Sequence, residues 1–239
     1  MIKVSTMKNK YFAFTLAETL ITLVIIGVIA AITVPVMMNA TNQAQFIERC
    51  KKMYSTLSQA KDLAEMNDGP MTGWDLSGYP GEDNSTVFVK KYILPYVVKA
   101  KDCGRTLQGS CAFQYRDLNS PNHANWSDGW HKIILNDGST AIFQYSENAD
   151  SRIVLAKVDV NGDAKPNVFG KDIFTFVYWL KSPNPPRIGK FEALGADWSR
   201  EALIATEGGN ACNMHSTGEL CAALLMKDGW QMLDDYPIH

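Results

Sequence analysis

A long apolar segment near the start of the chain, residues 14–38, decides what the rest can fold into. Ile, Val, Leu and Ala dominate it, and its only charged side chain is Glu18. As a helix it would measure about 37 Å at about 1.5 Å per residue, which is enough to cross a hydrocarbon core of about 30 Å. The apolar region of a secretory signal peptide is shorter than this segment and is followed by a small-x-small cleavage site. No such cleavage site follows residues 14–38. We therefore expect a single-pass transmembrane helix.

The charges around this segment predict its orientation. Lys3, Lys8 and Lys10 precede it without any acidic residue, so the N-terminus is expected in the cytoplasm and the remainder outside. The whole chain has 23 basic and 25 acidic residues, a net charge of -2. From residue 40 onward 20 basic and 24 acidic residues remain, a net charge of -4. This balance disfavours a nucleic-acid partner.

Residues 13–18, Ala-Phe-Thr-Leu-Ala-Glu, resemble the cleavage and methylation signal of type IV prepilins and type II secretion pseudopilins. In that family a membrane peptidase removes a short basic leader and methylates the new N-terminal residue. The resemblance implies a leader over residues 1–13, cleavage between Ala13 and Phe14, and N-methylation of Phe14. Glu18 then stands fifth in the mature chain. Pro35 stands twenty-second, where a proline bends the helix because it removes a hydrogen bond.

The resemblance also implies partners and an assembly role. The carboxylate of Glu18 would neutralise the Phe14 amine of a neighbouring subunit as the chain leaves the bilayer for a filament. The implied partners are prepilin peptidase, other pilin or pseudopilin subunits, the inner-membrane assembly platform and membrane lipid. The implied location is the cytoplasmic (inner) membrane, followed by a pilus or pseudopilus.

Beyond the membrane the helix is expected to continue over residues 39–68 as an amphipathic half. Apolar residues recur there at helical spacing, and Gly69 with Pro70 ends the pattern. The stripe consists of Phe46, Cys50, Met53, Leu57, Ala60 and Ala64. A long N-terminal helix packed on an antiparallel β-sheet head, an α+β fold, is also the pilin architecture.

The exported head, residues 69–239, has alternating strand and turn signals. Strands are expected over 132–135, 140–145, 153–160 and 173–179, and the Asn136-Asp137-Gly138 turn predicts a hairpin between the first two. Short connections favour an antiparallel meander. Short helices are expected over 85–94, capped by Asn84 or Ser85, and over 217–227.

The head holds most of the five cysteines, and export would place them where disulfides form. Cys103 and Cys111 are close in sequence, as are Cys212 and Cys221, which favours these local pairs and leaves Cys50 free on the helix stripe. Zinc is the alternative, but CxxC pairs are absent and only His215 is near.

No cofactor is expected, with calcium as a weaker alternative. Asp159, Asn161, Asp163 and Asp172 carry oxygen ligands after a strand, and Asn167 could replace Asp172 in the set. Ala164 and Gly170 occupy the positions where a calcium hand needs its turn glycine and its bidentate glutamate. An ordinary Asp/Asn/Gly turn is therefore the favoured interpretation.

The function expected from these features is that of a structural, non-enzymatic subunit of a type II secretion pseudopilus or a type IV pilus. A head of this size favours a minor component. A ligand-binding minor pilin, for adhesion or DNA uptake, is the alternative. An enzyme on a pilin-like anchor is a weaker one, because nucleophile-elbow, HExxH and phosphate-loop motifs are absent. Ser127, Asp128 and His131 are close in sequence but are interpreted as a turn beside a strand.

Overall fold

The computed structural model describes residues 15–77, 83–106, 108–125, 130–162, 164–205 and 209–238. The chain forms two compact units, Met1–Asn42 and Gln43–His239. Each is treated by itself below. The predictions for the leader, for cleavage at Ala13 and Phe14, and for Asp163 lie outside the described residues.

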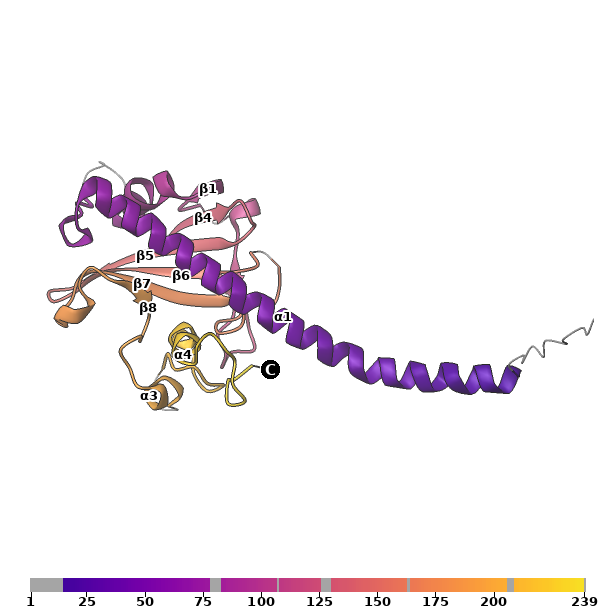
Figure 1. The fold of residues 1–239 in the computed structure, drawn as a ribbon. Coiled ribbons are helices and arrows are strands. Elements are labelled where there is room, and N and C mark those ends of the chain that lie inside the picture. The colour runs from indigo at the N-terminus through magenta and orange to yellow at the C-terminus, as the bar shows by residue number, and fades with distance from the viewer. Residues whose placement is uncertain are drawn as a thin grey trace, which may run out of the picture. The chain divides into compact units, whose positions relative to one another are not determined.

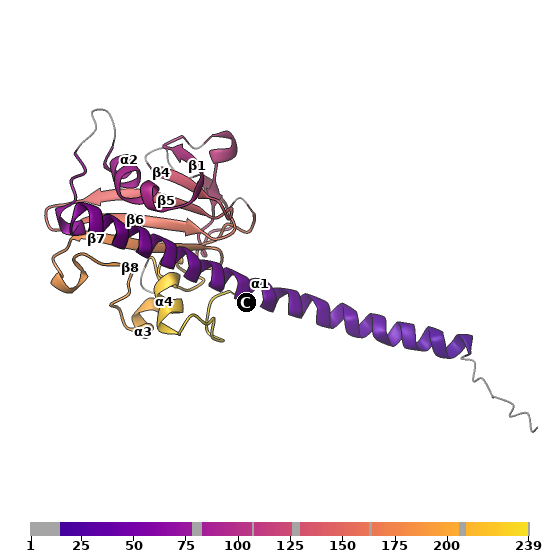
Figure 2. The same cartoon turned by 45° about the horizontal axis from the view of Figure 1, so that its top comes forward.

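One helix, α1 (Leu16–Asp68), covers both predicted halves of the N-terminal helix. In the second unit, residues 43–68 of α1 lie across one face of the head's sheet (Figures 1 and 2). The side chains that α1 buries there recur every three or four residues, as an amphipathic helix requires. They are Ile47, Cys50, Met53, Leu57, Ala60 and Ala64. Phe46, expected in this stripe, is only partly buried, and Ile47 takes its place. The helix ends before Gly69, whose φ is +80°.

The sheet of the head is an antiparallel meander of six strands. They are β1 (Lys99–Gly104), β4 (His131–Leu135), β5 (Thr140–Glu147), β6 (Arg152–Asp159), β7 (Ile173–Lys181) and β8 (Phe191–Ala193). Their spatial order β1-β4-β5-β6-β7-β8 follows the chain. Two further strands in the described residues, β2 (Gln114–Tyr115) and β3 (Ala124–Asn125), pair with each other. The predicted α+β fold and its antiparallel meander are therefore confirmed.

The predicted hairpin forms between β4 and β5, with Ile134 opposite Thr140. The Asp137 carboxylate accepts hydrogen bonds from the backbone N–H and hydroxyl of Ser139, which fixes the turn. β1 and β8 were not predicted. β1 pairs with β4 through two register irregularities, one between Lys99 and Lys101 and one between Asp102 and Gly104.

Short helices surround the sheet. α2 (Asn84–Phe88) continues as one π-helical turn (Val89–Ile93) and one 3-10 turn (Leu94–Tyr96), close to the predicted helix. Its cap is Asp83, not Asn84 or Ser85 as expected, because the Asp83 carboxylate accepts from the N–H groups of Ser85 and Thr86.

The remaining helical segments lie in the loops and near the C-terminus. α3 (Arg200–Ile204) was not predicted, and α4 (Cys221–Lys227) begins four residues later than expected. The other 3-10 turns are Met71–Gly73, Gly109–Cys111 and Pro185–Arg187.

Side chains from both faces of the sheet are buried. Ala141 and Phe143 of β5 belong to the main core, which also contains the buried face of α1. Ile142 lies between them and points to the opposite face, because side chains alternate along a strand. There it forms a second, smaller cluster with Phe113, Phe169 and others.

Candidate functional site

The polar start of α1 combines Thr15 and Glu18. Glu18 Oε2 accepts hydrogen bonds from the backbone N–H of Thr15 at 2.9 Å and from its hydroxyl at 2.9 Å. The Glu18 N–H in turn donates to Thr15 Oγ1 at 3.2 Å. This reciprocal pair is a capping box, which satisfies backbone donors that the first turn of a helix leaves unpaired.

Glu18 therefore has partners within its own chain. The sequence prediction assigned its carboxylate to the amine of a neighbouring subunit and did not consider Thr15. The spacing Thr-x-x-Glu at residues 15–18 is the known signature of a capping box, and it could have identified Thr15. A carboxylate at the start of a helix also interacts favourably with the helix dipole.

An apolar span follows this polar start. Residues Leu16–Val34 are long and apolar enough to cross a membrane, with a mean hydropathy of 2.3 and none of the span buried inside the protein. Thr19, Thr22 and Thr33 donate their hydroxyls to backbone carbonyls three or four residues earlier. Their polar groups are thus satisfied inside the helix, as a lipid environment requires. α1 continues through Pro35, and the bend expected there stays a prediction.

The cysteines of the head form two disulfides. Cys103 and Cys111 are joined with an S–S distance of 2.07 Å, and Cys212 and Cys221 with 1.99 Å. These are the two local pairs that the sequence favoured, and Cys50 is free and buried. A zinc site at Cys212 and Cys221 is not possible in this state, because a disulfide leaves no thiolate to bind the metal.

Two family models match the chain. Residues 8–34 match the "Prokaryotic N-terminal methylation motif". Residues 36–239 match the "Family of unknown function (DUF6613)", which is most of the chain. The chain belongs to the DUF6613 family. Neither the curated proteins nor the solved structures contain a match to it.

The methylation motif and the fold point to the same class of protein. This DUF6613 chain carries a prepilin-type signal, and its long N-terminal helix and antiparallel sheet fit a pilin-like fold. It is therefore a processed subunit of pilin or pseudopilin type, cut by a prepilin peptidase and assembled with other pilin subunits. The span Leu16–Val34 is its single-pass anchor in the inner membrane.

The predicted calcium ligands lie around the connection between β6 and β7 in this DUF6613 head. The Asp172 carboxylate accepts the backbone N–H groups of Asn167 at 2.8 Å and Val168 at 2.7 Å. Asp159 Oδ1 accepts the N–H of Asn161 at 2.9 Å. Within the described residues, no group of three or more His, Cys, Asp or Glu side chains could hold a metal ion. These contacts are those of a turn, and the expectation that no calcium binds here stays a prediction.

Burial raises the pKa of Asp172 above its ordinary value, although the N–H groups of Val168 and Asn167 oppose this shift. Both oxygens of this carboxylate already accept a backbone N–H group, Oδ2 from Asn167 and Oδ1 from Val168. The donor set of the described residues therefore fits the turn better than it fits calcium.

Of the residues that the sequence grouped as Ser127, Asp128 and His131, only His131 is described. It lies within β4 instead of a turn, and its side chain is fully buried, at 0% exposure. Its contacts come from residues far away in the sequence, Thr86 and Asp102.

The head also has a groove of about 360 Å³ between α1, residues 96–98 before β1, and residues 135–137 at the end of β4. Leu63 of α1 and Val98 are exposed apolar side chains along it. At one end Lys52 and Asp137 form an ion pair of 2.5 Å. The groove is therefore lined by both apolar and charged side chains.

Proposed function

We propose that this protein is a minor subunit of a type II secretion pseudopilus or a type IV pilus. In this proposal the leader and N-terminus lie in the cytoplasm and the head lies outside. Cleavage falls between Ala13 and Phe14, and Phe14 becomes N-methylated. The observation that carries the proposal is the methylation motif over residues 8–34, which coincides with an apolar span from Leu16 to Val34.

Two further observations support this orientation. The leader is basic and lacks acidic residues. Segments on the cytoplasmic side of a membrane helix usually carry an excess of Lys and Arg. The head carries two disulfides, which form and persist in oxidising compartments outside the cytoplasm.

The assembly step uses Glu18 in two successive arrangements. In the free subunit the capping box with Thr15 stabilises the carboxylate at the start of the membrane span. In the filament the same carboxylate faces the cationic N-terminus of a neighbouring subunit, because cleavage creates an amine at a helix N-terminus, where the helix dipole is already positive. Opposite charges in a low-dielectric environment attract far more strongly than in water.

Mass spectrometry of the mature N-terminus tests the processing step. The full chain is expressed in cells with and without a prepilin peptidase, and its N-terminal peptide is sequenced. The expected product with the peptidase begins at N-methylated Phe14, and the product without it keeps the leader. An intact leader in both cells, or a cut after residue 40, would overturn the proposal.

A second experiment tests assembly and separates the two systems. Filaments sheared from the host are probed for the mature chain after deletion of either the secretion ATPase or the pilus assembly ATPase. Loss in only one deletion assigns the chain to that system. A processed chain that never appears in sheared filaments would contradict the structural role.

A further inference from the structure

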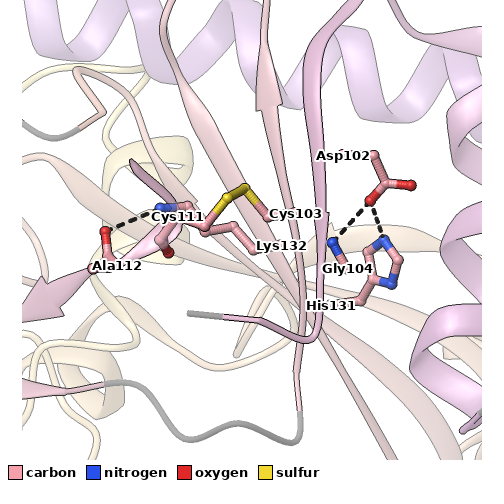
Figure 3. Close-up of a disulfide and its surroundings, with 7 residues drawn as sticks. All are labelled: Asp102, Cys103, Gly104, Cys111, Ala112, His131 and Lys132. Atoms are coloured by element: carbon pink, nitrogen blue, oxygen red, sulfur yellow. Dashed lines mark hydrogen bonds and ion pairs between the residues drawn. A yellow bond between two sulfur atoms is a disulfide. The ribbon is translucent and has the colours of Figure 1, made fainter. Parts of the chain in front are cut away.

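A buried histidine connects three elements at one side of the head. His131 of β4 has 0% of its side chain exposed. Its Nε2 lies 2.8 Å from Oδ1 of Asp102 in β1, and its Nδ1 lies 3.2 Å from the Thr86 hydroxyl of α2. Figure 3 shows His131 beside Asp102, next to the Cys103–Cys111 disulfide. We name Asp83, Thr86, Asp102 and His131 the His131 cluster.

The contact with Asp102 fixes one proton of the imidazole. Asp102 Oδ1 also accepts the N–H of Gly104 at 3.0 Å, so this oxygen acts as an acceptor (Figure 3). An ionised carboxylate has no donor, so Nε2 of His131 must carry a proton and donate it to Asp102. The protonation state of His131 is therefore decided at Nδ1.

The group facing Nδ1 is a hydroxyl with two possible acceptors. Thr86 Oγ1 lies 3.2 Å from His131 Nδ1 and 3.1 Å from Oδ2 of Asp83. A hydroxyl has one proton, so it can donate to only one of them at a time. With neutral His131, the hydroxyl donates to Nδ1. With protonated His131, Nδ1–H donates to Oγ1 and the hydroxyl turns to Asp83.

We propose that the His131 cluster is a pH-sensitive switch that loosens the start of α2 and the end of β1 from β4 in acid. A proton from solvent adds to Nδ1 of His131, and the Thr86 hydroxyl turns from His131 to Asp83. No covalent bond is broken in this step. The result is an imidazolium buried between β1, β4 and α2, and the surrounding segments open to hydrate it.

Charged groups on the neighbouring elements raise or lower the pKa of His131. Asp102 from β1 and Asp83 at the start of α2 favour the imidazolium, whereas Lys90 after α2 disfavours it. Arg105 lies 3.0 Å from Asp83 and compensates its charge. Lys132, the next residue of β4, points to the other face, where its Nζ donates to the carbonyls of Cys111 and Ala112. Residues 126–129, which precede β4, are outside the described ranges.

Burial lowers the pKa of His131 below its ordinary value, and the attraction of Asp102 offsets this only in part. The unfolded chain therefore takes up the proton first as the pH falls. Stability from neutral His131 is complete above the ordinary pKa of about 6.5 and decreases as the pH falls toward the lower folded pKa. Acid, not base, is the destabilising direction.

The first segments to open are those that depend on the cluster and reach solvent. The carboxylates of Asp83 and Asp102 are each 28% exposed. The Asp83 carboxylate accepts hydrogen bonds from the N–H groups of Ser85 and Thr86, and the Asp102 carboxylate accepts one from the N–H of Gly104. These amides are therefore the reporters of the switch.

Hydrogen exchange of the full chain in detergent tests the proposal. Protection factors, corrected for the intrinsic pH dependence of exchange, are compared at pH 7 and pH 5 for peptides covering 84–88 and 102–104. Both peptides are expected to lose protection as the pH falls below the ordinary pKa of histidine, by at most about tenfold for each pH unit, until the lower folded pKa of His131 is reached. A peptide from the centre of β6 and β7 serves as the internal reference and should keep its protection.

Two variants assign the effect to His131. His131→Gln should abolish the pH-dependent loss, and His215→Gln, a change at an exposed histidine, should leave it intact. Unchanged protection in the wild type at pH 5, or loss of the effect in His215→Gln, would overturn the proposal.

A second measurement does not depend on the folding of His131→Gln. The pKa of His131 is measured by NMR in Thr86→Ser, which keeps the hydroxyl, and in Thr86→Val, which removes it. The imidazolium needs the hydroxyl as an acceptor, so the pKa should fall further in Thr86→Val than in Thr86→Ser. Equal values, or a His131 that stays neutral until the whole head unfolds, would refute the switch.

Discussion

The carboxylate of Glu18 accepts hydrogen bonds from both the backbone N–H and the hydroxyl of Thr15, so the single acidic group of the membrane segment is satisfied by its own chain. A carboxylate without hydrogen-bond partners in lipid would raise the free energy of inserting the helix into the membrane. The capping box lowers this cost before any neighbouring subunit is present. Filament assembly must then replace these local contacts with an intermolecular one.

Removing the carboxylate should separate processing from assembly. In Glu18→Ala we expect normal cleavage after Ala13 but no incorporation into filaments, because the partner of the neighbouring amine is lost. Mass spectrometry of membranes and immunoblots of sheared filaments measure the two steps. Normal incorporation of Glu18→Ala would contradict the proposed role of the carboxylate.

Removing the Thr15 hydroxyl should have a milder effect. Thr15→Val keeps the backbone N–H that bonds Glu18 but loses the side-chain half of the capping box, which typically costs about 1 kcal/mol of helix stability. We expect processing and incorporation to persist, with faster hydrogen exchange in the first turn of α1. An assembly defect as complete as that of Glu18→Ala would show that Thr15 itself contacts a partner.

The disulfides should stabilise the head by comparable amounts. Each closes a loop of about ten residues, for which the chain-entropy relation gives about 2–3 kcal/mol. The double changes Cys103→Ser with Cys111→Ser, and Cys212→Ser with Cys221→Ser, should each lower the unfolding free energy by that amount. Chemical denaturation of the full chain in detergent measures this. Cys50→Ala is the control for loss of a cysteine outside a disulfide.

The buried face of α1 should be far more sensitive than its exposed face. Leu57 is 0% exposed and Leu63 is 44% exposed on the same helix. Leu57→Ala should cost about 2–5 kcal/mol of unfolding free energy, whereas Leu63→Ala should cost less than about 1 kcal/mol. Thermal unfolding measures the loss of stability in each variant, so the same Leu→Ala change is compared at a buried and at an exposed position of α1. Equal losses would mean that the contact of α1 with the sheet contributes little to stability.

Calcium should not stabilise the head. The carboxylates of Asp159 and Asp172 already accept backbone N–H groups of their own loop, so we expect the same unfolding temperature in excess calcium and in a chelator. A ligand that binds only the folded state would raise it. A rise that Asp159→Asn abolishes would instead establish the calcium site.

The parts of the fold that could be predicted have strong local signals. The β4–β5 hairpin has β-branched strands on either side of an Asn-Asp-Gly turn, and α1 has a regular apolar stripe. β1 lacks such a signal, because its sequence is mostly polar and its register is interrupted twice. β8 has three residues, too few for a detectable alternation.

Caps and clusters depend on geometry that a sequence does not contain. Asp83, Asn84 and Ser85 are all good capping residues, and only the observed hydrogen bonds select Asp83. The partners of His131 are 29 and 45 residues away, so its role follows only from the pairing of β1 with β4 and the packing of α2. Thr15 is the exception, because its spacing to Glu18 was visible in the sequence.

The irregular outer strand β1 has a consequence for a protein that is concentrated into a filament. A straight, apolar strand at the border of a sheet would pair with the same strand of another copy and cause aggregation. β1 instead carries the exposed cations Lys99 and Lys101 and two breaks in its register, which make such pairing unfavourable. Neighbouring heads in a filament would therefore not be expected to join into one continuous sheet through β1.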